Sequence, residues 1–330
     1  MGARGDQART GVSTASQRIL LVFVDGVGIG APDPTINPLA ANRYPAVEAL
    51  TGGARLTSEA PEFAGDHSLY RTIDANLGVD GLPQSGTGQA TLFTGVNCAE
   101  LAGRHYGPFP HSSSKSVIGT RNLFIDAARV IDTSPIFANA YPNRFFRYIE
   151  RTQRWTVTTL CCASAGVRLR TGEDLRKRMA VSADITGRAW PEPDSKHEVI
   201  TPHQAGRRLT GLAEESGLTV FEYFETDKAG HSRDFARAAD VLSRLDGLLE
   251  GILDSLRPDQ SLVVTSDHGN LEDLSRRTHT RNPVPLMVHG PAAHHFRDVD
   301  GLASVKPAIL TALGGMESPF DRHSGEGRNQ

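Results

Sequence analysis

The sequence has few cysteines. Only Cys98, Cys161 and Cys162 occur in 330 residues, and two of them are adjacent. An odd number, with no Cys-x-x-Cys spacing, excludes a disulfide framework and gives no sign of a cysteine-based zinc or redox site. We therefore expect buried, reduced thiols and a cytoplasmic location, because reduced thiols are typical of that compartment.

Long apolar runs and an excess of charge are also missing. No apolar run approaches the roughly 20 residues that a membrane span needs, and residues 1–17 lack the apolar core of a secretory signal. A net charge of −3 gives no reason to expect nucleic acid or an anionic membrane as a partner. With 38% hydrophobic and 22% charged residues, the composition is that of an ordinary globular protein.

The hydrophobic pattern predicts an α/β fold with a mostly parallel central sheet and helices on both faces. Residues 18–24 are almost continuously apolar, as in a strand that is covered on both sides. Strand patterns and helix patterns then alternate along the rest of the chain. Further strands are predicted at 218–224, 262–265 and 285–289, and helices at 44–50, 204–215, 235–256 and 306–313.

The alternation is interrupted in the middle of the chain. Residues 104–204 are rich in arginine, aromatic residues and proline, and we expect an inserted, smaller α+β cap domain there. Residues 18–103 and 205–316 would then form the core. The polar segments 1–17 and 317–330 are predicted to be a disordered lead and tail.

The sequence contains two glycine-rich stretches near candidate site residues. Gly26-Val-Gly28-Ile-Gly30 has the wrong spacing for a dinucleotide-binding turn and is followed by three prolines, which argues against a nicotinamide-dependent oxidoreductase. We expect a loop whose glycines let the backbone pass close to something held by Asp25. In Ser85-Gly-Thr-Gly-Gln89 we expect a tight turn into a short helix over 89–93, with Ser85 near its anion-binding N-terminus. The flanking residues do not fit the Gly-x-Ser-x-Gly motif of a serine esterase.

Carboxylates and histidines follow the predicted strands. In open α/β sheets the carboxyl ends of the strands form the ligand-binding edge. Each residue alone also fits an ordinary turn, cap or surface role, so their joint occurrence carries the argument. Such ligands suit Zn²⁺ or Mn²⁺, with Mg²⁺ as a further candidate. The candidate ligands are Asp25, Asp227, His231, Asp267, His268 and His279.

Two ions about 4 Å apart could clamp a phosphoryl group during its transfer. Ser85 is the candidate nucleophile, because coordination to a metal would deprotonate its hydroxyl. Lys228 and Arg281 lie inside the candidate metal motifs and are candidates for binding phosphate. Arg144 and Arg147 of the arginine-rich stretch 144–151 could bind a second anionic group or the ester phosphate, the alternative being solvated surface arginines.

The ordered set of motifs resembles the alkaline phosphatase superfamily. The set is strand-Asp-Gly at Asp25, Ser-x-x-Gly at Ser85, Asp-x-x-x-His at Asp227, Asp-His-Gly-Asn at Asp267, and His-Thr followed by proline at His279. The last two look most similar to the branch that contains cofactor-independent phosphoglycerate mutase and phosphopentomutase. The resemblance covers about residues 18–103 and 205–315.

This resemblance implies two divalent metal ions and a phosphoserine. One ion would be held by Asp227, His231 and His279, and the other by Asp25, Asp267, His268 and the oxygen of Ser85. The chain departs from the mutases at Gln89, where they commonly carry histidine, and in its shorter cap. No sulfatase motif follows Ser85.

We therefore expect a two-metal phosphoryl-transfer enzyme that acts on a small phosphate ester through a phosphoserine, as a phosphatase or a phosphomutase. The sequence hardly separates these two, because the difference lies in whether the cap excludes water. The alternatives are a catalytically inactive metal-binding protein used for interaction, and a phosphodiesterase or phosphonate hydrolase of the same superfamily.

Overall fold

The computed structural model describes residues 17–191 and 196–314. Apart from Gln17, the segments predicted to be disordered, 1–17 and 317–330, lie outside the described residues. The fold is built on a seven-stranded sheet in the order β2-β3-β9-β8-β1-β7-β4. The strands of this sheet are β1 (Arg18–Val24), β2 (Phe63–Ala64), β3 (Ser68–Ile73), β4 (Ile136–Phe137), β7 (Leu218–Tyr223), β8 (Gln260–Thr265) and β9 (Val284–His289).

The sheet is mixed. β1 lies between β7 and β8 and pairs with both in parallel, and β4 pairs in parallel with β7. β9 runs antiparallel to β8, and β3 and β2 continue the antiparallel half. The predicted α/β class is confirmed, with parallel pairing concentrated around β1.

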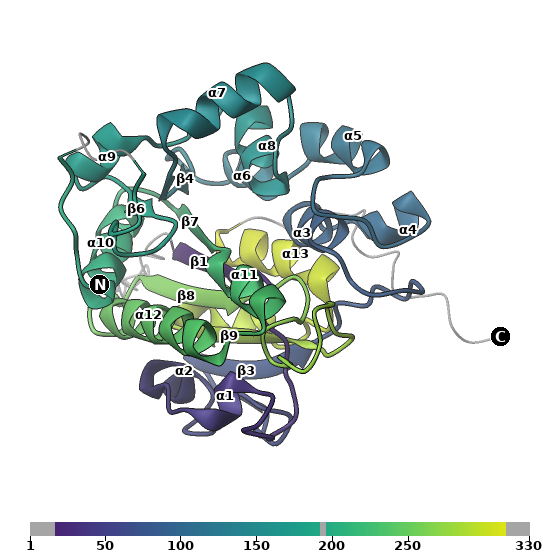
Figure 1. Cartoon of the computed structure of the whole chain (residues 1–330). Coiled ribbons are helices and arrows are strands. Elements are labelled where there is room, and N and C mark those ends of the chain that lie inside the picture. Colours follow the sequence, from purple (N-terminus) through teal and green to yellow (C-terminus); the bar gives the residue numbers. More distant parts are fainter. Residues whose placement is uncertain (1–16, 192–195, 315–330) are drawn as a thin grey trace, which may run out of the picture.

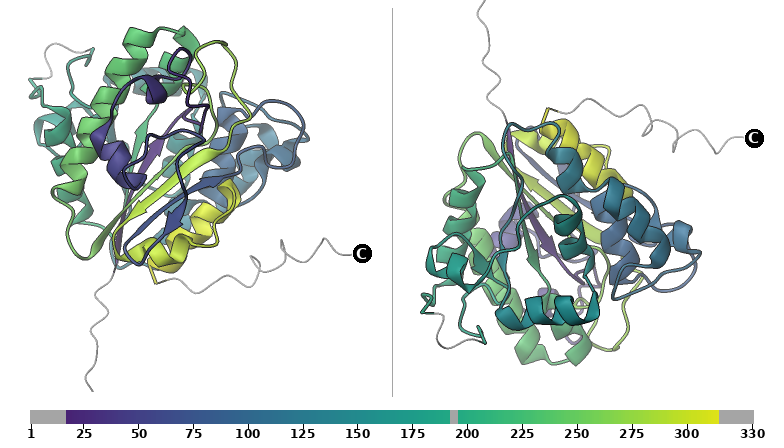
Figure 2. Two further views of the ribbon diagram at one scale, coloured as in Figure 1. Left: turned by 90° about the horizontal axis from the view of Figure 1, so that it is seen from below. Right: turned by 90° about the horizontal axis from the view of Figure 1, so that it is seen from above.

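Helices cover both faces of the sheet, as Figure 2 shows. Along β1, Ile19, Leu21 and Phe23 face one hydrophobic cluster, while the alternating residues Leu20, Val22 and Val24 face the other. All six are at most 3% exposed, which explains why this strand reads as a continuous apolar run. The first cluster includes α3 (Ser85–Thr94), α5 (Ser112–Thr120), α6 (Leu123–Ala127), α8 (Val157–Ser164) and α13 (Leu302–Ala312); the second includes α2 (Pro45–Leu50), α10 (Pro202–Ala213) and α12 (Phe235–Leu253).

The remaining elements are short. The four-residue helix α1 (Pro38–Ala41) lies inside the segment expected to be a loop. Proline fits its first turn, and Asn37 caps it by accepting from the Leu39 amide at 3.0 Å. The other elements are α4 (Cys98–Ala102), β5 (Asn139–Ala140), α7 (Asn143–Thr152), α9 (Gly172–Arg176), β6 (Val181–Ser182), α11 (Glu225–Ser232) and the 3₁₀ helix η2 (Pro291–Phe296).

Part of the predicted cap shares the core of the sheet. β4 belongs to the central sheet, and Phe124, Phe137 and Cys161 lie in the same hydrophobic cluster as β1. Helix α7 lies farther out, at the top of Figure 1. The division at residues 104 and 204 stays a prediction. Within the described residues, no helix is both long and apolar enough to cross a membrane.

Candidate active site

The candidate ligands meet at one edge of the sheet. Asp25 directly follows β1, and Asp267 and His268 follow β8. β7 leads into α11, which carries Asp227 and His231 one helical turn apart. His279 precedes β9, and it reaches the same edge because β9 runs antiparallel to its neighbours.

Asp227, His231 and His279 form a group that could hold a metal ion. The Nδ1 atoms of His231 and His279 lie 2.9 and 2.7 Å from the carbonyl oxygens of Arg277 and Pro83. Donation to these carbonyls leaves the two Nε2 atoms as lone-pair donors. They lie 3.2 Å apart and within 3.5 Å of the Asp227 carboxylate. Three electron-rich atoms therefore converge on one point.

A second group consists of Asp25, Asp227 and His268. The Nε2 atom of His268 lies 3.4 Å from Asp25 Oδ1 and 3.5 Å from Asp267 Oδ2. The structure thus brings Asp267 beside the predicted second ion group, while Asp227 lies between the two groups. The His268 and His279 rings stack with centroids 3.8 Å apart.

Burial favours the neutral forms of His268 and His279, whereas the hydrogen bond to Asp227 raises the pKa of His231. Burial, followed by the charge of Asp267, raises the pKa of Asp25 well above its usual value. Burial and the charge of Asp227 raise the pKa of Asp267 to about 7. Burial lowers the pKa of His268, and burial with the neighbouring His268 lowers that of His279 to about 4. Burial works to raise the pKa of Asp227, but hydrogen bonding to His231 and the charge of His268 bring it below the usual range.

The donor set fits divalent cations. Oδ1 of Asp25 and Oδ2 of Asp267 are buried and have no hydrogen-bond partner among the described residues. Buried carboxylate oxygens that lack a donor are costly unless a cation neutralises them. Clustered carboxylates and neutral imidazoles are ligands of Zn²⁺ and Mn²⁺.

Ser85 begins α3 and lies in the same cluster. The helix starts at Ser85, four residues earlier than expected, so Gly86 and Gly88 are helical rather than turn residues. A Cβ atom on Gly86 would meet the Phe109 carbonyl oxygen at 2.2 Å, and one on Gly88 would meet that of Asp267 at 2.8 Å. These glycines therefore allow close packing that places Ser85 Oγ 2.9 Å from His268 Nε2.

The Gly26–Gly30 loop packs against two acidic residues. Gly26 has φ +71°, and a Cβ atom there would lie 2.7 Å from Asp227 Oδ1. Cβ atoms on Gly28 and Gly30 would collide with Glu272 at 2.4 and 2.8 Å. The loop thus approaches Asp227 and Glu272, and its approach to a group held by Asp25 stays a prediction.

Glu272 was not predicted as a site residue from the sequence, and its carboxylate accepts hydrogen bonds from three of the motif loops. It is 1% exposed. Its Oε2 accepts from the amides of Gly28 at 2.9 Å and Asn270 at 2.8 Å. Its Oε1 accepts from the Thr280 hydroxyl and from Asn282 Nδ2. The available signal in the sequence for this role was an acidic residue two positions after Asp-His-Gly-Asn.

We expect Glu272→Gln to loosen these loops. The amide cannot accept from every donor that the carboxylate satisfies, and loss of a charged acceptor costs about 2 kcal/mol of the free energy of unfolding. Urea denaturation of the metal-free protein and calorimetric titration with Mn²⁺ should show lower stability and weaker binding. Asp273→Asn is the control, since the half-buried Asp273 carboxylate bonds to Arg276 and Ser275, which are close to it in sequence. Equal behaviour of the two variants would contradict the role of Glu272.

A cavity of about 760 Å³ opens onto the cluster. Asp25, Ser85 and Asp227 are among the residues that line it, and so are the predicted substrate-binding residues Arg144 and Lys228. Arg147 is exposed and Arg281 binds the Gly81 carbonyl through Nε at 2.9 Å, and neither lines this cavity. The helical register of α7 instead brings in Phe145, Tyr148 and Arg151.

Three polar residues at the site were not recognised as site residues. Gln89 Nε2 donates to Asp25 Oδ2 at 3.1 Å, and Asn270 Nδ2 donates to Asp227 Oδ1 at 2.7 Å. Glu222 lines the cavity from β7, and burial raises its pKa to about 7. A charged residue in an otherwise apolar strand was the available signal for Glu222.

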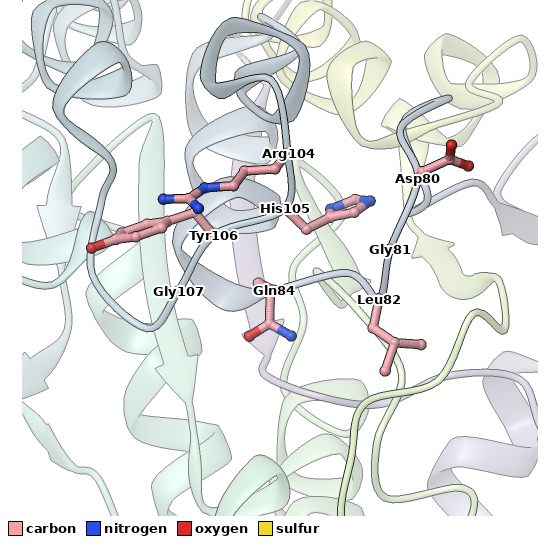
Figure 3. A pocket seen from close by; sticks show the side chains of 8 residues that line it. All are labelled: Asp80, Gly81, Leu82, Gln84, Arg104, His105, Tyr106 and Gly107. Carbon is pink, nitrogen blue, oxygen red and sulfur yellow. The ribbon is translucent and has the colours of Figure 1, made fainter.

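A second cavity, of about 500 Å³, lies beside the loop that leads into Ser85 (Figure 3). Gln84, Arg104, His105 and Tyr106 are among its lining residues. It contains none of the candidate ligands. The segment that forms it supports α3, because the Thr87 amide donates to the Tyr106 carbonyl at 2.9 Å and the Tyr106 amide donates to Thr87 Oγ1 at 3.1 Å.

Residues 200–316 match the family model described as Metalloenzyme superfamily. The match contains Asp227, His231, Asp267, His268 and His279, and the relationship expected from the motifs is confirmed. Asp25 and Ser85 lie outside the matched residues, and the fold places both beside His268.

Curated proteins that are similar to part of this chain include phosphoglycerate mutases. The 2,3-bisphosphoglycerate-independent phosphoglycerate mutase of Cereibacter sphaeroides is 30% identical over 130 residues, which cover 37% of this chain and 26% of that relative. The enzyme of the same name from Roseobacter denitrificans is 31% identical over 154 residues, covering 42% and 30%. The matched region thus spans less than a third of either relative.

Solved structures with a similar fold include two alkaline phosphatases. That of the Antarctic bacterium TAB5 superposes with a TM-score of 0.51 at 9% identity and covers 91% of this chain and 98% of that one. The cold-active enzyme from Shewanella sp. gives a TM-score of 0.50 at 14% identity, covering 89% and 99%. The core is therefore alkaline-phosphatase-like in fold.

Proposed function

We propose that the protein is a two-metal phosphoryl-transfer enzyme that acts on a small phosphate ester through a phosphoserine at Ser85, as a phosphatase or a phosphomutase. The observation that carries this proposal is the placement of Ser85 Oγ, 2.9 Å from His268 Nε2 and inside a cluster of orphaned carboxylate oxygens. The Metalloenzyme superfamily match and the mutase relatives support it.

Two sets of residues would hold the ions. Asp227, His231 and His279 would hold one, and Asp25, Asp267 and His268 the other, with Asp227 close to both. Mn²⁺ or Zn²⁺ fits these donors best, and Mg²⁺ is the remaining candidate. When bound, the ions would neutralise the phosphoryl oxygens and lower the pKa of the serine hydroxyl.

The residues of the chain orient the reaction. Ser85 Oγ forms a bond to phosphorus as the bond from phosphorus to the ester oxygen breaks. The serine hydroxyl releases its proton to solvent, and the departing ester oxygen takes one up and leaves as the alcohol. Amide dipoles in the first turn of α3 favour the negative phosphoryl group beside Ser85. Attack on phosphoserine by water then gives a phosphatase, and attack by a substrate hydroxyl gives a mutase. Either attack returns Ser85 to its starting state.

The proposal is tested with p-nitrophenyl phosphate. Purified protein is stripped with a chelator, reloaded in turn with Mn²⁺, Zn²⁺ or Mg²⁺, and assayed for nitrophenol release. The same samples are examined by intact-protein mass spectrometry for a phosphate adduct on Ser85. We expect release or adduct formation that depends on metal. Neither signal in any of the three metals would refute the proposal and favour a catalytically inactive metal-binding protein.

A further inference from the structure

The cavity above Ser85 points to a class of substrate, an inference that rests on the proposed function. We propose that it selects phosphate monoesters whose alcohol portion carries a flat aromatic ring system. Cavities of roughly 300–1,000 Å³ hold drug-sized ligands, and this one, at about 760 Å³, falls in that range. A three-carbon phosphate ester would leave most of it unfilled.

Aromatic side chains form much of the wall. Phe145 and Tyr148 come from α7, Tyr141 precedes that helix, and Trp190 and Phe224 come from other segments. The Tyr141 and Phe145 rings already stack, with centroids 4.1 Å apart and planes at 26°. Faces and edges of such rings favour another flat ring over a small, heavily hydroxylated group.

The polar side chains of the wall are mostly engaged within the protein. Asp184 accepts from the Ser182 hydroxyl at 2.6 Å and from the amides of Gly187 and Ala189 at 3.0 and 2.9 Å. Glu222 accepts from the Thr158 hydroxyl at 3.0 Å. These two acidic side chains are therefore less available to recognise the hydroxyls of a sugar or glycerate.

The cations of the wall come from two helices, α7 and α11. Arg144 and Arg151 lie on one face of α7, and both are exposed. Among the described residues, neither has a carboxylate partner within 4.0 Å. Lys228 pairs with Glu225 at 2.8 Å and lies 4.3 Å from the centre of the Phe224 ring. A guanidinium can stack on an aromatic ring or pair with a phosphate, so these arginines suit a flat anionic ligand.

Binding to the metal-loaded Ser85→Ala protein tests this without requiring turnover. The probes are 2-naphthylmethyl phosphate, adenosine 5′-monophosphate, cyclohexylmethyl phosphate and ethyl phosphate, titrated by calorimetry. We expect at least one flat probe to bind about ten-fold more tightly than both non-aromatic probes. The tighter of the two flat probes distinguishes a simple aryl ester from a nucleotide. Equal affinities for all four would overturn the inference.

Variants of Tyr148 provide the second arm. Tyr148→Leu keeps apolar volume but removes the ring, and we expect it to weaken the preferred flat probe about ten-fold while leaving ethyl phosphate unchanged. Tyr148→Phe should behave like the unaltered residue, and Arg147→Ala is the control on the same helix. An equal loss for flat and ethyl probes would contradict ring recognition. Failure of turnover with these binding results intact would refute the proposed function alone.

Discussion

Ser85→Ala should abolish turnover while leaving the fold intact. Ser85 is 8% exposed and its hydroxyl contacts His268, so alanine removes the attacking oxygen with little change in packing. Loss of a nucleophile costs about 1,000-fold or more in kcat. The measurement is metal-dependent hydrolysis of p-nitrophenyl phosphate, together with phosphate on the protein by mass spectrometry.

Ser182→Ala is the matched control for this experiment. Ser182 lines the same cavity, but its hydroxyl donates to Asp184. It should retain turnover and the phosphate adduct. If Ser85→Ala kept near-full activity, or if the adduct mapped to another residue, Ser85 would not be the nucleophile.

Asp227→Asn should have the second large effect, because Asp227 belongs to both groups that could hold a metal. Its carboxylate lies within 3.5 Å of Nε2 of His231 and His279. We expect the variant to lose at least one equivalent of bound metal and about 100-fold or more in rate, exceeding the loss typical of residues that only orient a ligand. Elemental analysis after gel filtration measures the metal content.

Glu225→Gln controls for the general loss of negative charge. Glu225 lines the same cavity two residues earlier, but it pairs with Lys228 and Arg237. This variant should keep its metal content. An unchanged metal count in Asp227→Asn would remove Asp227 from the ligand set.

The meeting of the candidate ligands at one sheet edge could be predicted because each lies in a local motif beside a strand with a strong apolar pattern. Asp25 after β1 and Asp267 after β8 follow from continuous apolar runs and from the rule that ligands gather at one sheet edge. His279 reaches that edge by a different route, at the start of antiparallel β9. The motif around His279 predicted its place in the cluster. The antiparallel direction of β9 was not predicted.

The role of Glu272 could not be predicted because its partners are mainly backbone groups from distant loops. Nothing in residue types shows that the Gly28 amide will face a carboxylate of the chain's last third. Which arginines of the middle segment line the cavity could not be predicted, for another reason. No helix was predicted there, so the register of α7, which brings Arg144 and Arg151 to the cavity and leaves Arg147 outside it, could not be assigned.

The central place of β1 has a consequence for how the chain folds. β1 comes from the start of the sequence, yet Ile19 pairs with Leu218 and Arg18 pairs with Gln260. Such distant pairings close large loops and slow the folding of a chain. We therefore expect Asp25 to meet Asp227 and His268 only after most of the chain has collapsed. Metal ions that bind only once these ligands are assembled would slow unfolding and leave the rate of folding nearly unchanged.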